Sequence, residues 1–291
     1  MAALGGRVVI VTGAGQGLGR EHARLIAEEG GSVVVNDVGC RADGSGSNPD
    51  VARETAEEIG AAGGQAVANS DDVSTLEGAQ RALQAGLDEF GAVHGLVNNA
   101  GMLRDRMFVN MSEEEWDEVI RGQLRATFCP TRILAGHWRE RTKSGEHVSA
   151  SIVNVSSTSG LMGQAGQSNY GAAKAGIASL SIILADELQR YGVRVNAITP
   201  VARTRMTETV PGIADIVAAP ADPESFDVYH PGNVSPLVAW LLTEGCTSTG
   251  NTFYAKGGEV RQLIPWQYGK VIDKGDRWTV DELDQRMQAL I

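Results

Sequence analysis

The chain has 291 residues, with 25 Lys and Arg against 36 Asp and Glu, which gives a formal net charge of −11. An acidic chain repels the phosphate backbone and no run of basic residues offsets this charge, so we expect no nucleic-acid partner. Hydrophobic residues at 42% and charged residues at 21% are typical of a globular α/β protein and not of a disordered one. We therefore expect a sizeable hydrophobic core.

The cysteines, histidines and chain ends exclude further classes of protein. Cys40, Cys129 and Cys246 form no CxxC pair and the five histidines lack ligand spacing, so we expect neither a disulfide framework nor a metal site. No stretch approaches the roughly 20 apolar residues of a membrane helix. The N-terminus does not resemble a secretory signal, and the terminal residues 288–291 are no peroxisomal signal. We expect a cytoplasmic protein with no membrane partner.

Short β-branched segments alternate with amphipathic segments along the chain. The predicted strands are residues 7–12, 32–37, 66–69, 93–98, 151–156, 193–199 and 251–255. The predicted helices, with apolar residues three and four apart, are residues 19–29, 51–61, 75–90, 113–141 and 170–190. Ser112 and Glu115 form a capping box, and Asn169 is expected to cap the helix that follows it. The alternation predicts an α/β fold, a single doubly wound Rossmann-type domain whose seven-stranded parallel sheet is flanked by helices.

Two segments differ from this pattern. We assign residues 1–260 to the Rossmann domain, and within it residues 201–232 form a proline-containing irregular loop that we expect to close over substrate as a lid. Residues 261–291 form a C-terminal extension that contains Trp266, Tyr268 and Trp278. The sequence leaves open whether this extension packs on a neighbouring subunit or covers the cleft.

The first turn predicts a dinucleotide site. A glycine-rich segment, Thr12 to Gly19, follows the first predicted strand, and the second predicted strand ends at Asp37. Glycines let the backbone approach a diphosphate, and free N–H groups at a helix N-terminus face the anion. Asp37 can accept hydrogen bonds from both ribose hydroxyls of NAD but would repel the 2′-phosphate of NADP. We therefore predict NAD as the preferred cofactor; the alternative is that Asp37 only caps a turn.

The TGxxxGxG spacing at the first turn resembles the short-chain dehydrogenase/reductase family, and motifs farther along extend the resemblance over residues 5–260. These motifs are Asp72-Val73, Asn98-Asn99-Ala100-Gly101, Ser157, Tyr170-Gly-Ala-Ala-Lys174 and the segment 196–200. The resemblance implies a homotetramer built from the long helices. It also implies these cofactor-binding residues: Gly13, Gln16, Gly17, Leu18, Gly19, Asp37, Asp72, Val73, Asn99, Ala100, Gly101, Tyr170, Lys174, Pro200 and Thr204. For Thr204, simple capping of a loop remains an alternative.

Ser157, Tyr170 and Lys174 predict a proton-transfer site. Oxidising an alcohol requires its oxygen to lose a proton, and a free tyrosine, with a pKa of about 10, is a poor base at neutral pH. Lys174 lies four residues after Tyr170, so its charge is expected to favour the phenolate, while Ser157 holds the substrate oxygen. Gln123 replaces the family's usual Asn; its amide is one methylene farther out, so a water-linked proton relay through Lys174 would have altered geometry.

The substrate class follows from a narrower resemblance. The segments 33–37, 65–69, 98–106 and 205–210 resemble the dehydrogenase part of peroxisomal multifunctional β-oxidation enzymes and of their bacterial relatives. The resemblance implies that a 3-hydroxyacyl thioester, as a coenzyme A ester of a fatty acid or a steroid side chain, is oxidised to the 3-oxo form. The candidate contacts to the coenzyme A phosphates are Arg104, Arg106, Arg203 and Arg205. The alternative for these arginines is pairing with nearby acidic residues at the surface.

Two other functions remain open from the sequence. One is a broad alcohol, steroid or 3-oxoacyl-carrier-protein reductase that uses the same site. The other is a catalytically silent NAD-binding protein, which only Gln123 and Val201, in place of the family's usual Asn and Gly, would suggest.

Overall fold

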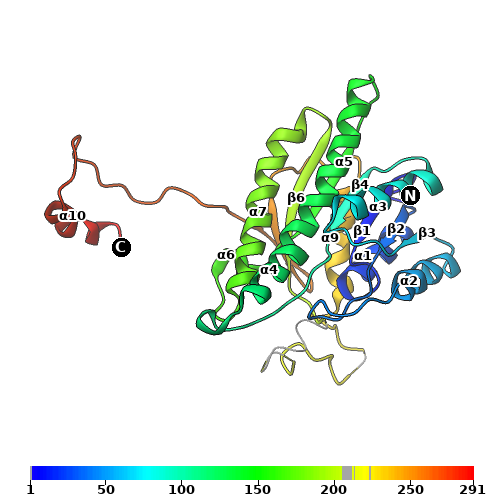
Figure 1. Ribbon diagram of the computed structural model, residues 1–291, viewed down its shortest axis with the longest axis horizontal. Coiled ribbons are helices and arrows are strands. Elements are labelled where there is room, and N and C mark those ends of the chain that lie inside the picture. The colour runs from blue at the N-terminus through cyan, green and yellow to red at the C-terminus, as the bar shows by residue number, and fades with distance from the viewer. Residues whose placement is uncertain (1, 205–211, 213, 223) are drawn as a thin grey trace.

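The computed structural model describes residues 2–204, 212, 214–222 and 224–291. Eight strands form one sheet in the order β3-β2-β1-β4-β5-β6-β7-β8 (Figure 1). Their bounds are β1 (Val8–Thr12), β2 (Ser32–Asn36), β3 (Gln65–Asn69), β4 (Gly95–Asn98), β5 (Ala150–Val155), β6 (Val193–Pro200), β7 (Thr252–Lys256) and β8 (Glu259–Leu263). The order reverses between β1 and β4, so the predicted doubly wound Rossmann fold is confirmed.

The sheet has one strand more than the sequence predicts. β1 to β7 pair in parallel, whereas β8 pairs antiparallel with β7 after a tight turn at Gly257 and Gly258. Gly257 has φ +54°, which suits the turn because glycine enters this region without steric cost. β8 also crosses the predicted boundary at residue 260, so the domain's sheet extends to Leu263.

Helices cover both faces of the sheet. In the described ranges of the chain, the α-helices are α1 (Gly17–Glu28), α2 (Asp50–Ala61), α3 (Leu76–Phe90), α4 (Glu113–Ile120), α5 (Ala126–Lys143), α6 (Thr158–Met162), α7 (Ser168–Gln189), α9 (Ser235–Leu242) and α10 (Val280–Arg286). Alternate residues of β1 enter different cores: Val9 and Val11 pack with α1 and α9, while Val8 and Ile10 pack with α3, α5 and α7. Such strands are buried on both faces, which is why they appear in the sequence as continuous apolar runs.

Two helix predictions need correction. The expected helix over residues 113–141 is divided by one π-helical turn, Arg121–Arg125, which places Gln123 where the helix is locally widened. Asn169 does not cap α7, since this helix starts at Ser168 and Gln167 occupies the N-cap position. The Asn169 side chain is buried and donates to the carbonyls of Arg104 and Glu115. The capping box at Ser112 is confirmed.

The C-terminal extension leaves the domain after β8. Figure 1 shows it running away from the body of the molecule toward α10 at its far end. Trp266 and Tyr268 are fully exposed on it. Within the described residues, no helix has both the length and the apolar character needed to cross a membrane.

Candidate active site

The glycine-rich segment forms a backbone cradle between β1 and α1. Gly13 has φ +63°, and a Cβ atom there would lie 2.8 Å from the Ala100 Cα atom. A Cβ atom on Gly19 would lie 2.1 Å from the Gly13 carbonyl oxygen, so both positions require glycine. Gln16 is the N-cap residue of α1 but makes no capping bond, and the first turn carries no acidic residue. The amide groups at this helix start therefore suit an anionic group.

The NNAG segment holds this cradle in place. The Asn99 amide nitrogen donates to the carbonyl oxygens of Thr12 and Gly13, each at 3.0 Å. The Thr12 hydroxyl accepts from the backbone nitrogens of Asn99 and Ala100 at 3.1 and 3.0 Å. The side chain of Asn99 thus positions the glycine turn, while the segment's backbone lines the pocket beside it.

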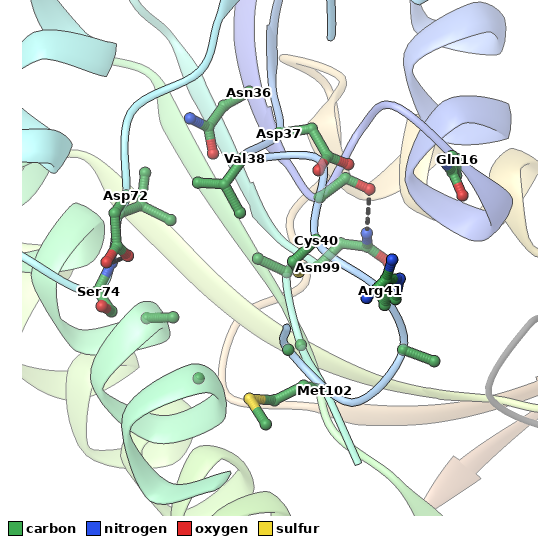
Figure 2. A pocket seen from close by; sticks show the side chains of 18 of the residues that line it. Gln16, Asn36, Asp37, Val38, Cys40, Arg41, Asp72, Ser74, Asn99 and Met102 are labelled. Atoms are coloured by element: carbon green, nitrogen blue, oxygen red, sulfur yellow. Dashed lines mark hydrogen bonds between the residues drawn. The ribbon is translucent and has the colours of Figure 1, made fainter. Parts of the chain in front are cut away.

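A pocket of about 460 Å³ lies along this cradle (Figure 2). The predicted cofactor residues that line it are Gly13, Gln16, Gly17, Leu18, Asp37, Asp72, Val73, Asn99, Ala100, Gly101 and Thr204. The predicted residues outside its lining are Gly19, Tyr170, Lys174 and Pro200. Pro200 is the last residue of β6, and Gly19 is buried in α1 against the cradle.

Asp37 lies at the end of β2 with its carboxylate toward the cradle. One carboxylate oxygen accepts from the Gly15 nitrogen at 2.9 Å, and the other accepts from the Gly39 nitrogen at 2.7 Å. Each carboxylate oxygen can accept a second hydrogen bond, so capacity remains for hydroxyl groups of a ribose. The glycine cradle and this carboxylate together fit a nicotinamide dinucleotide.

The far end of the pocket is bounded by Asp72 and Val73. One Asp72 carboxylate oxygen accepts from the Ser74 nitrogen at 2.9 Å, and the other is paired with Arg121 from the π-helical turn. Arg121 lines the pocket and was not expected as a site residue. A break in a helix cannot be read from apolar periodicity, so the sequence carried no signal for this contact.

Ser157, Tyr170 and Lys174 meet beyond β5, on the edge where α/β sheets bind ligands. A hydrogen bond links the Ser157 and Tyr170 side chains. The Lys174 ammonium nitrogen lies 5.5 Å from the Tyr170 ring centre and donates to the Val155 carbonyl oxygen at 2.6 Å. The serine, tyrosine and lysine named from the sequence therefore lie together.

Burial controls the protonation of this group. It raises the pKa of Tyr170 to about 12, although the hydrogen bond with Ser157 acts in the opposite direction and the charge of Asp105 adds to the rise. Burial also lowers the pKa of Lys174 to about 7. From the sequence we expect the charge of Lys174 to lower the pKa of Tyr170; in the structure the loss of hydration dominates the pKa shifts of both groups.

Gln123 is buried, and its side chain is bonded to the backbone of another segment. Its amide nitrogen donates to the Met102 carbonyl oxygen at 2.7 Å, and its side chain is 1% exposed. The amide oxygen is buried and has no hydrogen-bond partner among the described residues. Gln123 thus joins the π-helical turn to the segment that follows the NNAG motif, which suits a positioning residue.

A glycine cradle that fits a dinucleotide, beside a serine, a tyrosine and a lysine that could exchange protons, is the arrangement expected of an oxidoreductase that acts on CH–OH groups. The family model for short chain dehydrogenases matches residues 7–212, and the chain belongs to that family. Its members use a nicotinamide dinucleotide.

Three similar proteins illustrate the relationship. The chain is 43% identical over 266 residues to hydroxyacyl-CoA dehydrogenase ChsB1 of Mycobacterium tuberculosis, covering 90% of this chain and 81% of that protein. It is 41% identical to the mouse peroxisomal multifunctional enzyme type 2, covering 89% of this chain and 32% of that longer protein. A crystal structure of a short chain dehydrogenase from Mycobacterium avium matches with a TM-score of 0.87 and 44% identity, covering 99% of this chain and 95% of that one.

Proposed function

We propose that this chain is an NAD-preferring dehydrogenase that converts a 3-hydroxyacyl-CoA thioester to its 3-oxo form. The similarity to a hydroxyacyl-CoA dehydrogenase along most of both chains supports this substrate class. Ser157, Tyr170 and Lys174, which the proposed chemistry needs, lie together in this chain. Asp37 is the basis for the proposed preference for NAD over NADP, since its carboxylate lines the pocket and would repel the 2′-phosphate of NADP.

The proposed chemistry assigns one task to each side chain. Ser157 holds the substrate oxygen by a hydrogen bond, and Tyr170 exchanges a proton with that oxygen. A nicotinamide dinucleotide held by the glycine cradle and Asp37 would supply the acceptor for the hydride of the substrate carbon. Lys174, with its pKa near neutrality, can release and take up the proton that reaches Tyr170. Because Tyr170 holds its proton tightly, the tyrosine acts as an acid more readily than as a base at neutral pH.

The pairing of the candidate arginines bears on the coenzyme A moiety. Arg104 is paired with Glu118, Arg106 with Glu115 at 2.8 Å, and Arg203 with Asp227 at 2.5 Å. Arg205 lies outside the described residues, as does part of the proposed lid over residues 201–232. In our proposal a coenzyme A phosphate must therefore compete with a carboxylate already present at each described arginine.

The test follows NADH absorbance with 3-hydroxyacyl-CoA esters, steroid alcohols and simple secondary alcohols. We expect turnover on the acyl-CoA esters, with kcat/KM at least tenfold higher for NAD than for NADP. Tyr170→Phe serves as the control: it should abolish turnover while NADH binding remains measurable.

Other outcomes separate the alternatives. A 3-oxoacyl-[acyl-carrier-protein] reductase from Synechocystis is 34% identical over 263 residues. Activity confined to carrier-protein thioesters would favour that reaction, and absence of turnover on every substrate would favour a silent binding protein.

We also propose a homotetramer that forms through α5 and α7. Phe128 on α5 is 48% exposed, and Ile182 and Ile183 on α7 are 39% and 51% exposed, which is consistent with a covered surface in an assembly. Light scattering of the purified chain tests this, and Ile183→Glu should reduce the measured mass. A monomer at all concentrations would contradict it.

A further inference from the structure

A loop after β2 covers part of the cofactor pocket. This roof loop comprises residues 38–48, and the Asn48 nitrogen closes it by donating to the Val38 carbonyl oxygen at 3.0 Å. A Cβ atom on Gly39, which has φ +68°, would lie 2.0 Å from the Asn48 carbonyl oxygen, so the neck of the loop requires glycine.

The roof loop is fastened across the cleft. The Leu103 nitrogen donates to the Ala42 carbonyl oxygen at 3.1 Å, and the Arg104 side chain donates to the Asp43 carbonyl oxygen at 3.2 Å. Gly44 packs so closely on Met102 that a Cβ atom would lie 2.5 Å from the methionine sulfur. The loop therefore spans from the Asp37 side of the pocket to the segment after the NNAG motif.

Arg41 lies on this loop and is exposed at the wall of the pocket. Its backbone nitrogen donates to the Ser45 carbonyl oxygen at 2.8 Å, and its own carbonyl accepts from Gly44 at 2.9 Å, which makes a tight turn. The side chain lines the pocket together with Gln16 and Asp37 (Figure 2). The backbone of residue 41 is thus fixed opposite the glycine cradle.

The charge of Arg41 distinguishes it from the other arginines at the cleft. Among the residues that the structure describes, two arginines line the pocket, and one of them, Arg121, is paired with Asp72. Arg104, Arg106 and Arg203 near the cleft are also paired with carboxylates. Within the described part of the chain, Arg41 forms no ion pair, so its guanidinium is not held by a carboxylate as those of the other arginines are.

We propose that Arg41 contacts the diphosphate of the nicotinamide dinucleotide from the roof-loop side, opposite the amide groups of the glycine cradle. A dinucleotide brings two negative charges to a chain of net charge −11, and a guanidinium can bind phosphate oxygens in a bidentate manner. The diphosphate is a better candidate than a 2′-phosphate, because the Asp37 carboxylate in the same pocket would repel a 2′-phosphate. The roof loop also crosses the cleft, which allows Arg41 to contact the diphosphate. This inference rests only on the dinucleotide and not on the acyl-CoA substrate.

The test measures binding of four probes, NADH, NADPH, ADP and adenosine, by calorimetry or by competition against NADH fluorescence. Arg41→Ala should weaken NADH and ADP binding by about 10- to 100-fold, the usual cost of a charged hydrogen bond, and leave adenosine binding unchanged. Arg41→Lys should retain part of the affinity, and the difference between wild type and Arg41→Ala should shrink at high salt. Arg53→Ala is the matched control, because this arginine on α2 carries the same charge but pairs with Asp50 and Glu57 outside the pocket.

Several results would overturn the proposal. Unchanged NADH affinity in Arg41→Ala would show that Arg41 does not contact the dinucleotide. An equal loss for adenosine would mean that Arg41 contacts the adenosine part and not the diphosphate. An equal loss of NADH affinity in Arg53→Ala would show that the effect comes from the change in net charge and not from a contact. A loss confined to NADPH would assign Arg41 to the 2′-phosphate instead. None of these measurements uses the acyl-CoA substrate, so they are independent of the proposed reaction.

Discussion

His22 anchors α1, the helix whose N-terminus faces the cofactor pocket. The burial of its side chain predicts that the folded protein loses stability in acid. Its side chain is fully buried in α1, and its Nδ1 atom lies 2.8 Å from the Ser235 hydroxyl at the start of α9. The Nε2 atom has no hydrogen-bond partner among the described residues. A second proton on this ring would be a buried charge without a partner, and burial accordingly lowers the pKa of His22 to about 3 from 6.5.

The sign and size of the effect follow from this difference in pKa. Because the folded state holds the proton more weakly, the unfolded chain takes up a proton below pH 6.5 that the folded chain does not bind. The stabilisation of the folded state by the buried, neutral His22 is therefore fully present above pH 6.5 and is lost as the pH falls toward 3. Each pH unit in this window costs about 1.4 kcal/mol, so acidification from pH 6.5 to 5 should lower the free energy of unfolding by about 2 kcal/mol.

Urea unfolding at pH 7 and pH 5 measures this contribution when wild type is compared with His22→Gln. Glutamine does not titrate, so the loss between the two pH values should be smaller in the variant by about 2 kcal/mol. The burial-lowered pKa values of His94 and His137 affect both chains alike and cancel in the comparison. His147→Gln, at an exposed position, should behave as wild type does. Equal pH dependence in wild type and His22→Gln would refute the reasoning.

Three further predictions concern the site. Asp37→Asn keeps an acceptor for the Gly15 amide but removes the negative charge. The kcat/KM for NADP, relative to that for NAD, should therefore rise by about tenfold. An unchanged ratio would show that Asp37 does not determine the cofactor preference. Gln123→Asn cannot span to the Met102 carbonyl and should lower the free energy of unfolding in urea by about 1 kcal/mol, whereas unchanged stability would show that the bond is dispensable. Because burial raises the pKa of Tyr170 to about 12, alcohol oxidation should accelerate as the pH rises from 7 to 10 while ketone reduction does not, and a flat oxidation profile would contradict this assignment.

The strands were predictable from the sequence where burial on both faces leaves continuous apolar runs. The run in residues 7–12 became β1, and its residues alternate between the two cores of the molecule. β8 escaped prediction because it is an edge strand of sequence EVRQL, exposed along its middle residues. Its place depends on pairing with β7 and not on an apolar pattern of its own.

The site was predictable where its residues are close in sequence. Tyr170 and Lys174 share a helix face because they are four residues apart, and the glycine segment is a local turn. Contacts between distant segments left no such pattern: the pair of Arg121 with Asp72 depends on a π-helical turn, and the roof loop depends on hydrogen bonds across the cleft. The pKa of Lys174 was unpredictable for the same reason, since burial is a property of the folded chain.

The paired arginines lead to a last prediction, which separates a phosphate contact from a structural ion pair. Arg203 is bonded to Asp227 and to the Val217 carbonyl oxygen, and both partners of the ion pair are only 20% exposed. Hydrogen bonding to Arg203 lowers the pKa of Asp227, so the carboxylate remains charged at neutral pH and competes with any incoming phosphate. Asp227→Asn removes this competing charge and keeps an oxygen that can accept from the Tyr229 nitrogen.

If Arg203 contacts a coenzyme A phosphate, Asp227→Asn should lower KM for a 3-hydroxyacyl-CoA by about threefold, the scale of a partly exposed ion pair. The matched substrate is the N-acetylcysteamine thioester of the same acid, which has the thioester but no phosphate, and its KM should not change. A KM that rises for both thioesters, together with a lower midpoint of urea unfolding, would identify the pair of Arg203 and Asp227 as structural. The coenzyme A phosphates would then have to bind elsewhere on the chain.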